Sequence, residues 1–454
     1  MAESQSKLPL PRVLAFAGVG VPLAAVGLPM AVFVAPMYSD NLGLGTTLVG
    51  TIFMLLRFWD LASDVIMGWL VDTRPTKRGR IKHWLILGIP VLGLGAWLVF
   101  APQSESVGTV YLSISLAILW AGFTLVMTPH QSWVPLITDT YDERSRMFMW
   151  REVINTATLL SLLILPFFLQ QRFGFDLRQQ VAVMGIVVVI ALPITIGLAV
   201  KFVPDAPPNP SDPTNVFTWT EVWAALRDPV IARLLLIEIF IGFAVAATGS
   251  TFLFAAREGF GLGPEAPIVL LIYFVAGFAS MPLWIAFSKR SEKHLIMRFV
   301  CLWSALTFPL YFIFASVGGG LAMIICGAVL TGIGYGTPFI LARSMMADII
   351  ERAEVQTGTV RPGLYYSIMS ASYKTGASLA IGIPYIILGV LIGFDASGNN
   401  PPEVVTGLML VFVGIPVVCN LLAAFLTFGY SLTRQVQEDN AAVLGSKKPN
   451  SIRD

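Results

Sequence analysis

Two aspartates, Asp60 and Asp64, lie within a stretch that is long and apolar enough to cross a bilayer, and Arg57 precedes them. A carboxylate at that depth costs about 2.5 to 3.5 kcal/mol on insertion scales, so two of them on one helix require an explanation. Their spacing from Arg57 places all three side chains on one helical face, where both carboxylates can converge on one small cation. The alternative is an ion pair that only fixes helix packing, but one arginine neutralises only one of two acids.

The composition is that of a membrane protein. The 454 residues are 56% hydrophobic and 12% charged, with a mean hydropathy of +0.76, whereas soluble domains carry about 25% charged residues. The apolar runs have helical length and lack the alternation of an outer-membrane barrel. We expect an all-α integral protein of the inner or plasma membrane, whose N-terminus, MAESQSKLPLPR, carries no cleavable signal.

Apolar windows of about 20 residues predict twelve transmembrane helices. They lie near residues 13–38, 47–71, 84–101, 108–130, 150–170, 180–202, 230–254, 266–288, 295–316, 320–345, 364–391 and 404–429. Prolines within these windows predict kinks, at Pro22, Pro29, Pro129, Pro282, Pro338 and Pro384.

Lysine and arginine are distributed unequally over the predicted loops. One side carries Arg74, Lys77, Arg78, Arg80, Lys82, Arg144, Arg146, Lys289, Arg290 and Lys293, and the other only Arg172, Arg178 and Arg257. The positive-inside rule then places both termini in the cytoplasm. A cytoplasmic linker, 204–228, separates the bundle 1–203 from the bundle 229–430, and 431–454 form a cytoplasmic tail. The linker is proline-rich at first, and its second half predicts a short amphipathic helix on the membrane surface.

The two halves of the chain resemble each other. Span four ends TPHQSWVPLITDTYDER and span ten ends TPFILARSMMADIIERA. At one constant offset, Thr128-Pro129 matches Thr337-Pro338, and the acids Asp139 and Asp142 match Asp348 and Glu351. Two related six-helix halves are typical of major-facilitator transporters, whose central site lies between the halves.

Three sequence segments also carry a family resemblance. FWDLASDVIMGWLVDTRPTKRGRIKHWLILG resembles the second-helix signature of the glycoside–pentoside–hexuronide:cation symporters, the family of melibiose permease. WVPLITDTYDERSRM resembles the family's loop after helix four, and MMADIIERAEVQTGTVRPGLYYSIMSASYKTG its loop into helix eleven. The resemblance implies twelve helices in two pseudo-symmetric bundles and cation-coupled sugar transport by alternating access.

The resemblance also implies roles for particular residues. The positions of Asp60 and Asp64 are the family's cation ligands, and Thr124 aligns with a cation-site threonine. Family members place a third acid where this chain has Met127, which removes an oxygen ligand and favours H⁺ slightly over Na⁺. Arg151 is the best match to the family's sugar-contacting arginine, although a helix-end anchor is the alternative.

Lys374 lies in the middle of the predicted eleventh helix, where a buried ammonium needs a carboxylate partner or becomes neutral. We expect it to pair with Asp60 or Asp64 when the cation is absent, with Arg57 compensating the other acid. Loading of the cation would then release the lysine and couple cation binding to solute binding. The alternative is a lysine that snorkels to the membrane surface.

Further candidates are weaker. Glu238 is an intramembrane acid that lines the solute path or stays protonated as a structural group, and four ring or amide side chains are expected to contact a sugar: His130, Gln131, Trp133 and Tyr373. A cytoplasmic gate is expected from the charged residues near the helix ends, namely Asp72, Asp139, Asp142, Arg144, Asp348 and Glu351.

The favoured function is symport of a sugar or glycoside with H⁺ or Na⁺, the only cofactor expected. The first helix, FAGVGVPLAAVGLPM, lacks the family's sugar-binding acid, so a transporter of lysolipids or other amphiphiles is the alternative. An integral-membrane enzyme is disfavoured because no nucleophile–base pair, metal cluster or phosphate-binding glycine motif is evident. We expect a monomer in the lipid bilayer with no nucleic-acid partner.

Overall fold

The computed structural model describes residues 8–73, 79, 81–103, 107–137, 141–205, 219–288, 291–357, 362–436, 439 and 443. This part of the chain consists of helices and connecting loops and holds no β-strand, which confirms the predicted all-α class. It divides into two compact units. Several predicted loop residues, including Asp139 and those at 74–78, 80, 206–218 and 289–290, lie outside the described residues.

The first unit comprises Met1–Pro213, Gly249–Leu271 and Ile381–Leu408. Its helices are α1 (Leu10–Gly18), α2 (Gly20–Pro29), the π-helix η1 (Met30–Val34), α3 (Ala35–Ser39), α4 (Thr46–Thr73), α5 (Lys82–Phe100), α6 (Thr109–Ile137), α7 (Tyr141–Phe173) and α8 (Leu177–Phe202). It also includes the π-helices η3 (Ala255–Gly259) and η4 (Ile387–Ile392). The unit is therefore larger than the bundle 1–203, because helix ends from the second half of the sequence pack with it.

The second unit comprises Thr214–Thr248, Ile272–Ala380 and Met409–Asp454. It contains all or most of α9 (Trp219–Arg227), α10 (Pro229–Phe254), α11 (Ala266–Ser288), α12 (Lys293–Thr307), α13 (Pro309–Ser316), α14 (Gly320–Gly332), α15 (Thr337–Thr357), α16 (Pro362–Ile386) and α17 (Pro402–Leu426). The helix predicted in the linker is α9. The core of the second unit is an apolar cluster that includes Leu234, Met297, Val300, Met345 and Ile349.

Eleven helical runs in the described residues are long and apolar enough to cross a membrane. They correspond to all of the predicted spans except the second. That span is α4, whose 28 residues reach about 42 Å at 1.5 Å per residue. Length therefore permits α4 to cross a bilayer, and its charged residues distinguish it from the other spans.

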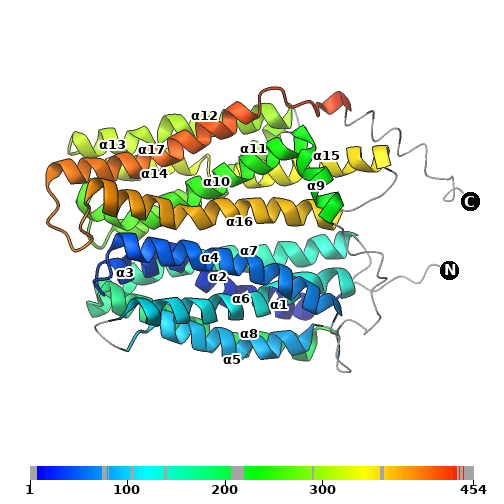
Figure 1. Cartoon of the computed structure of the whole chain (residues 1–454), viewed down its shortest axis with the longest axis horizontal. Helices are drawn as coiled ribbons and strands as arrows, with labels where there is room; N and C mark the ends of the chain where they lie inside the picture. Colours follow the sequence, from blue (N-terminus) through cyan, green and yellow to red (C-terminus); the bar gives the residue numbers. More distant parts are fainter. Residues whose placement is uncertain are drawn as a thin grey trace, which may run out of the picture. The chain divides into compact units, whose positions relative to one another are not determined.

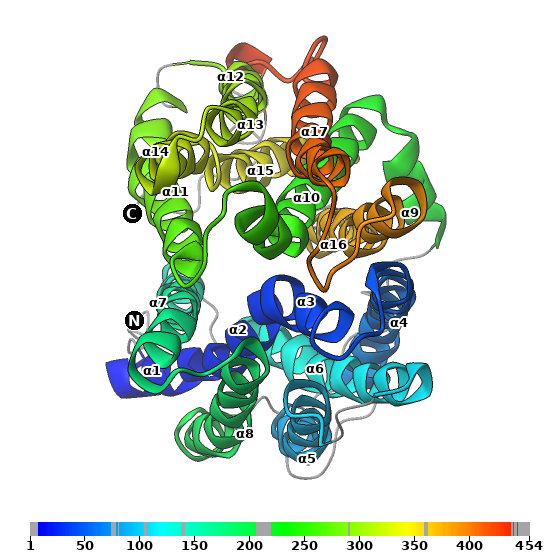
Figure 2. The same ribbon diagram turned by 90° about the vertical axis from the view of Figure 1, so that its left-hand side faces the viewer.

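Close helix packing positions α4 and α6. In the first unit α5 runs beside α6 and α8, and α6 also packs on α4 (Figures 1 and 2). A Cβ atom added at Gly122 would lie 2.5 Å from Leu92 Cα, and one added at Gly95 would lie 2.5 Å from Leu119 Cα. Glycines at such contacts let two membrane helices approach closely. The contact of α5 with α6 therefore holds α6 rigidly against its neighbours.

Several predicted kinks are changes of helix type. Pro29 is followed directly by η1, and η4 begins three residues after Pro384. π-helical turns of this kind often mark functional positions. The predicted span 320–345 is interrupted: α14 ends at Gly332 and α15 begins at Thr337, immediately before Pro338. Glycine has low helix propensity and proline cannot donate a backbone hydrogen bond, which explains why the helix restarts there.

Candidate functional site

The two aspartates of α4 share hydroxyl groups from α6. Asp60 is 1% exposed, and Asp64 is half-buried. Thr124 Oγ1 lies 3.2 Å from Asp60 Oδ1 and 3.3 Å from Asp64 Oδ1. Helical spacing therefore does bring both carboxylates to one point, and the packing of α4 on α6 brings a hydroxyl oxygen between them.

Two more hydroxyls complete this oxygen cluster. Thr128, one turn after Thr124, donates to Asp64 Oδ1 at 3.3 Å. Ser63 Oγ lies 3.0 Å from Thr124 Oγ1 and donates to the backbone oxygen of Asp60 at 2.9 Å. Sequence reasoning missed both residues, although the i, i+4 spacing of Thr124 and Thr128 was a signal that could have found Thr128.

Oxygen acceptors are concentrated in this cluster. Ser63 and Thr128 each use their single hydrogen on one oxygen, and the one hydrogen of Thr124 is within reach of both carboxylates. A hydroxyl supplies one donor and two lone pairs, and an ionised carboxylate supplies acceptors alone. One added proton or one oxygen-seeking cation would relieve the repulsion between the two carboxylates. The arrangement is thus chemically suited to binding a monovalent cation.

Arg57 compensates one acid of the pair. Its Nη1 lies 3.2 Å from Asp60 Oδ2, at an angle that gives an ion pair without a hydrogen bond. The guanidinium carbon lies 4.1 Å from the ring centroid of Trp120 on α6, a cation–π contact that fixes the arginine. Trp120 therefore positions Arg57 and does not present an open face for a sugar ring on that side.

The predicted solute contacts of the first unit lie in different environments. His130 is fully buried and stacks on Phe16 of α1 at 4.2 Å. Its Nε2 donates to the Phe16 carbonyl at 2.9 Å, while its Nδ1 has no partner. Trp133 is also buried and donates to the carbonyl of Pro204 at 3.0 Å. Gln131 is exposed, and Arg151 is half-buried on α7.

The second unit contains the other candidates for the solute site. Tyr373 and Lys374 are half-buried on α16, and Glu238 is 4% exposed on α10. Glycines bring these two helices together, because a Cβ at Gly242 would lie 2.5 Å from the Tyr373 carbonyl oxygen. Tyr373 also packs edge-on against Phe339 of α15, with ring centroids 5.3 Å apart. Helices α10, α15 and α16 therefore meet at the level of Tyr373.

The interruption of span ten lies beside this meeting point. On its carbonyl side the oxygen of Ile333 accepts from Ser280 and from Trp284, each at 2.9 Å. On its N–H side Thr337 is 2% exposed and its hydroxyl has no hydrogen-bond partner. A buried hydroxyl left in that condition costs roughly 1 to 3 kcal/mol.

Charged residues at helix ends form separate pairs. Asp348 accepts two hydrogen bonds from Lys293 Nζ, both at 2.7 Å. Asp228 accepts from Arg352 at 2.5 Å and from the N–H of Val230 at 2.8 Å, so it caps α10. Of the predicted gate residues, Asp139 and the side chains of Asp72, Asp142 and Arg144 lie outside the described part, and Glu351 is half-buried on α15.

A second ionic cluster lies within the first unit, among helix ends from both halves of the sequence. Arg257 of η3 pairs with Asp40 after α3 and with Glu258, and it donates to the carbonyl of Ala396 after η4. Tyr385 of α16 donates to the carbonyl of Ser250 at 3.0 Å. Within the first unit, these contacts hold the segments Gly249–Leu271 and Ile381–Leu408 at the end that contains the loop after α5.

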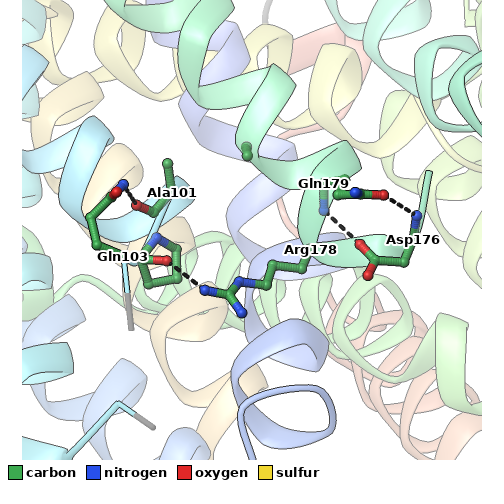
Figure 3. A pocket seen from close by; sticks show the side chains of 7 residues that line it. Ala101, Gln103, Asp176, Arg178 and Gln179 are labelled. Atoms are coloured by element: carbon green, nitrogen blue, oxygen red, sulfur yellow. Dashed lines mark hydrogen bonds between the residues drawn. The ribbon is translucent and has the colours of Figure 1, made fainter. Parts of the chain in front are cut away.

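A pocket of about 340 Å³ also lies at that end, lined by the loop after α5 and the start of α8 (Figure 3). Asp176 and Gln179 bond to each other in a capping box at the start of α8. Arg178 reaches across the pocket and donates to the carbonyl of Pro102 at 2.9 Å. These polar groups bind neighbouring parts of the chain, so we assign the pocket a structural role.

Known proteins resemble this chain over most of its length. A family model described as MFS/sugar transport protein matches residues 15–434. The glucuronide carrier protein homolog of Escherichia coli (strain K12) is 25% identical over 426 residues, which cover 92% of each chain. The sodium-dependent lysophosphatidylcholine symporter 1 of Gallus gallus is 21% identical over 490 residues, 99% of this chain and 92% of that protein.

The fold is also found in a solved structure. The crystal structure of the nucleoside transporter NupG matches with a TM-score of 0.64 at 13% identity, covering 93% of this chain and 100% of the other. At that identity the likeness concerns the fold alone. It agrees with the all-α membrane architecture derived from hydropathy.

Proposed function

Because the chain belongs to the MFS/sugar transport protein family of the major facilitator superfamily, we propose that it is a secondary active transporter. It couples the entry of H⁺ or Na⁺ to the movement of a glycoside-like solute by alternating access. Matches to a glucuronide carrier homolog and to a sodium-dependent symporter support this class of function. They also confirm the resemblance to the cation-coupled sugar symporters that the sequence motifs indicated.

The oxygen cluster of α4 and α6 is the observation that carries the proposal. Asp60 and Asp64 are held near Thr124, while Arg57 pairs with Asp60. A carboxylate oxygen can take up a proton, and carboxylate and hydroxyl oxygens also suit a hard cation. Binding of the cation therefore stabilises the cluster and can shift the equilibrium between the conformations of the transport cycle.

We propose that side chains of the second unit contact the solute, and Arg151 of the first unit stays a separate candidate for such a contact. Tyr373, Lys374 and Glu238 supply a ring, an ammonium and a carboxyl group within one compact unit. The burial of His130 and Trp133 against α1 and the linker supports a role in packing for these two residues. Gln131 keeps its place among the proposed contacts because it is exposed.

An amphiphile is the second candidate for the solute. In the first helical run the central stretch from Val19 to Val34 holds no polar side chain. A site next to such a surface offers few hydrogen bonds to a sugar and suits an acyl chain instead. The similarity to a lysophosphatidylcholine symporter supports this alternative.

The proposal is tested by reconstituting the purified protein into proteoliposomes with a Na⁺ gradient, a proton gradient or neither. Uptake of a labelled panel of glycosides, glycuronides and lysolipids is then followed. We expect one class to accumulate only with a cation gradient, and Asp64→Asn to lose that accumulation while retaining exchange of solute. Accumulation that is indifferent to both gradients would overturn the proposal. We further propose an inner-membrane location with both termini cytoplasmic.

A further inference from the structure

We propose that the N-terminus of α15, inside span ten, binds an anionic group of the transported solute, a carboxylate or a phosphate. The inference rests on the proposed transport function and specifies the chemistry of its solute. It arises from the interrupted helix, where carbonyl groups at the end of α14 have hydrogen-bond partners and the Thr337 hydroxyl at the start of α15 has none.

The helix that begins at the interruption has the length needed for an anion site. α15 runs for 21 residues from Thr337 to Thr357. The N–H groups of its first turn have no acceptor within their own helix, and the aligned peptide dipoles leave positive charge there. Pro338 carries no N–H, so Thr337, Phe339 and Ile340 supply the available donors. Such an N-terminus is suited to a carboxylate or a phosphate.

A hydroxyl at this N-terminus is also without a partner. A threonine at the start of a helix commonly accepts from an N–H of the first turn. Thr337 does not do so: its hydroxyl is buried with the residue only 2% exposed, and it has no hydrogen-bond partner. By contrast Thr331, at the end of α14, bonds Tyr311 Oη at 3.2 Å and the Gly327 carbonyl at 2.8 Å. Of these two buried threonines, the one at the start of α15 therefore lacks a hydrogen-bond partner and the one in α14 does not.

The carbonyl groups at the end of α14, up to Ile333, are already satisfied. Ser280 and Trp284 both donate to Ile333, and Trp303 donates to the Leu330 carbonyl at 2.8 Å. The N–H groups of Gly334 and Tyr335 bond back to Thr331 and Gly332. The N–H groups of the first turn of α15 and the Thr337 hydroxyl remain. Backbone N–H groups are completed only by acceptor atoms, which an anionic oxygen supplies and a cation does not.

The surroundings suit the rest of such a solute. Tyr335 and Phe339 have ring centroids 5.8 Å apart, and Tyr373 follows at 5.3 Å from Phe339. These three side chains are half-buried, and Phe339 also packs against the apolar core of the second unit. These rings are suited to an apolar portion of the solute beside its anionic group.

The test compares matched solutes that differ in the anionic group. One pair is 4-nitrophenyl β-D-glucuronide and 4-nitrophenyl β-D-glucoside, in which a carboxylate replaces a hydroxymethyl group. The other pair is a lysophosphatidic acid and the monoacylglycerol with the same acyl chain. Binding to the purified full-length protein is measured by equilibrium titration. We expect the anionic member of one pair to bind at least about tenfold more tightly, as a charge-assisted hydrogen bond implies. The pair that responds identifies carboxylate or phosphate as the source.

Variants of two threonines in one span connect the preference to α15. Thr337→Val should reduce the anionic preference several-fold without altering the affinity for the neutral member, and Thr337→Ser should retain it. Thr331→Val is the matched control, because it removes a buried hydroxyl of α14 that is internally satisfied. It should lower thermal stability but leave the preference unchanged.

Other outcomes would overturn the inference. Equal or weaker binding of both anionic members, including no binding at all, contradicts an anion subsite. A preference that survives in Thr337→Val places the subsite elsewhere. Failure of the proposed function looks different: an anionic solute then binds in a Thr337-dependent manner but is not accumulated under any cation gradient.

Discussion

The same dipeptide, threonine followed by proline, has two fates in the two halves of this chain. In the first unit Thr128-Pro129 lies within the continuous helix α6, and the Thr128 hydroxyl donates to Asp64. In the second unit Thr337-Pro338 begins a new helix, and the Thr337 hydroxyl has no partner. The internal repeat therefore keeps the two residue types, but the structural setting and the hydrogen bonding of the threonine differ between the halves.

The preceding residues explain the difference. α6 reaches its proline through Leu125, Val126 and Met127, side chains that pack well in a helix. Span ten reaches its proline through Gly332, Gly334 and Gly336, which destabilise helix by roughly 1 kcal/mol each relative to alanine. Helix continuity therefore decides the position of the threonine. In a continuous helix its hydroxyl bonds an acid on a neighbouring helix, and in an interrupted one it lies at a helix N-terminus.

The largest expected effect comes from the acids that Thr128 and Thr124 contact. Asp60→Asn and Asp64→Asn should each abolish uphill accumulation, because losing one partner of a buried charged site costs about 3 kcal/mol or more. That corresponds to more than about a hundredfold in cation affinity. Accumulation in membrane vesicles is measured at equal protein level. Accumulation at the original level in either variant would contradict the cation-site assignment.

Lys374→Leu should also lose active transport, with a smaller effect on exchange. The sequence predicts that Lys374 compensates the acids when no cation is bound, and this pairing stays a prediction. An uncompensated buried charge is often worse than the loss of both partners. Combining Lys374→Leu with Asp60→Asn should therefore recover stability or downhill exchange relative to Lys374→Leu alone. A double variant that is no better than the single variant would rule the pairing out.

Gly332→Ala should disturb the interruption of span ten. A Cβ atom at Gly332 would lie 2.3 Å from the carbonyl oxygen of Tyr273, a backbone atom that cannot move aside easily. We expect a loss of about 1 to 3 kcal/mol in stability, read as a lower melting temperature. Gly197→Ala on α8 is the control, since nothing lies within 4 Å of the added atom. Equal melting temperatures for the two variants would show that the contact with α11 is not tight.

The smallest of these effects is expected at the helix ends. Asp348→Asn weakens the pair with Lys293, whose side chains are 10% and 26% exposed. A partly buried pair of this kind should contribute about 1 to 2 kcal/mol, so the melting temperature falls by a few degrees with unchanged solute preference. Asp395→Asn is the control. Hydrogen bonds from Ser397 hold the pKa of this exposed carboxyl below its ordinary value, but its loop position makes the change nearly neutral. A changed solute preference in Asp348→Asn would argue against a purely structural pair.

Much of the first unit's candidate site was predictable from sequence. Hydropathy located α4, and the spacing of Asp60 and Asp64 placed them on one face because a helix has a fixed period. The role expected of Thr124 came from the family resemblance. Thr128 and Ser63 were not predicted, because hydroxyl groups on a membrane helix commonly bond to their own backbone. Only the packing of α4 on α6 shows which of them reach an acid.

The second unit was less predictable. A hydropathy window treats span ten as continuous, since glycine is close to neutral on such scales and hides the interruption at 333–336. The missing partner of Thr337 depends on side chains of α11 that satisfy the neighbouring carbonyl instead. The eventual burial of His130 against Phe16 likewise depends on how α1 packs on α6, which spacing alone does not reveal.

The most direct test titrates the purified protein with cation and with solute in Thr128→Val and Thr337→Val side by side. Removing the Thr128 hydroxyl should weaken cation binding by about tenfold, the effect of one hydrogen bond to a charged group, and leave solute affinity at fixed saturating cation unchanged. Removing the Thr337 hydroxyl should weaken binding of the anionic solute and leave cation affinity, measured without solute, unchanged. If the two variants alter both affinities alike, or if their effects are reversed, the division of roles between the two threonine-proline pairs is wrong.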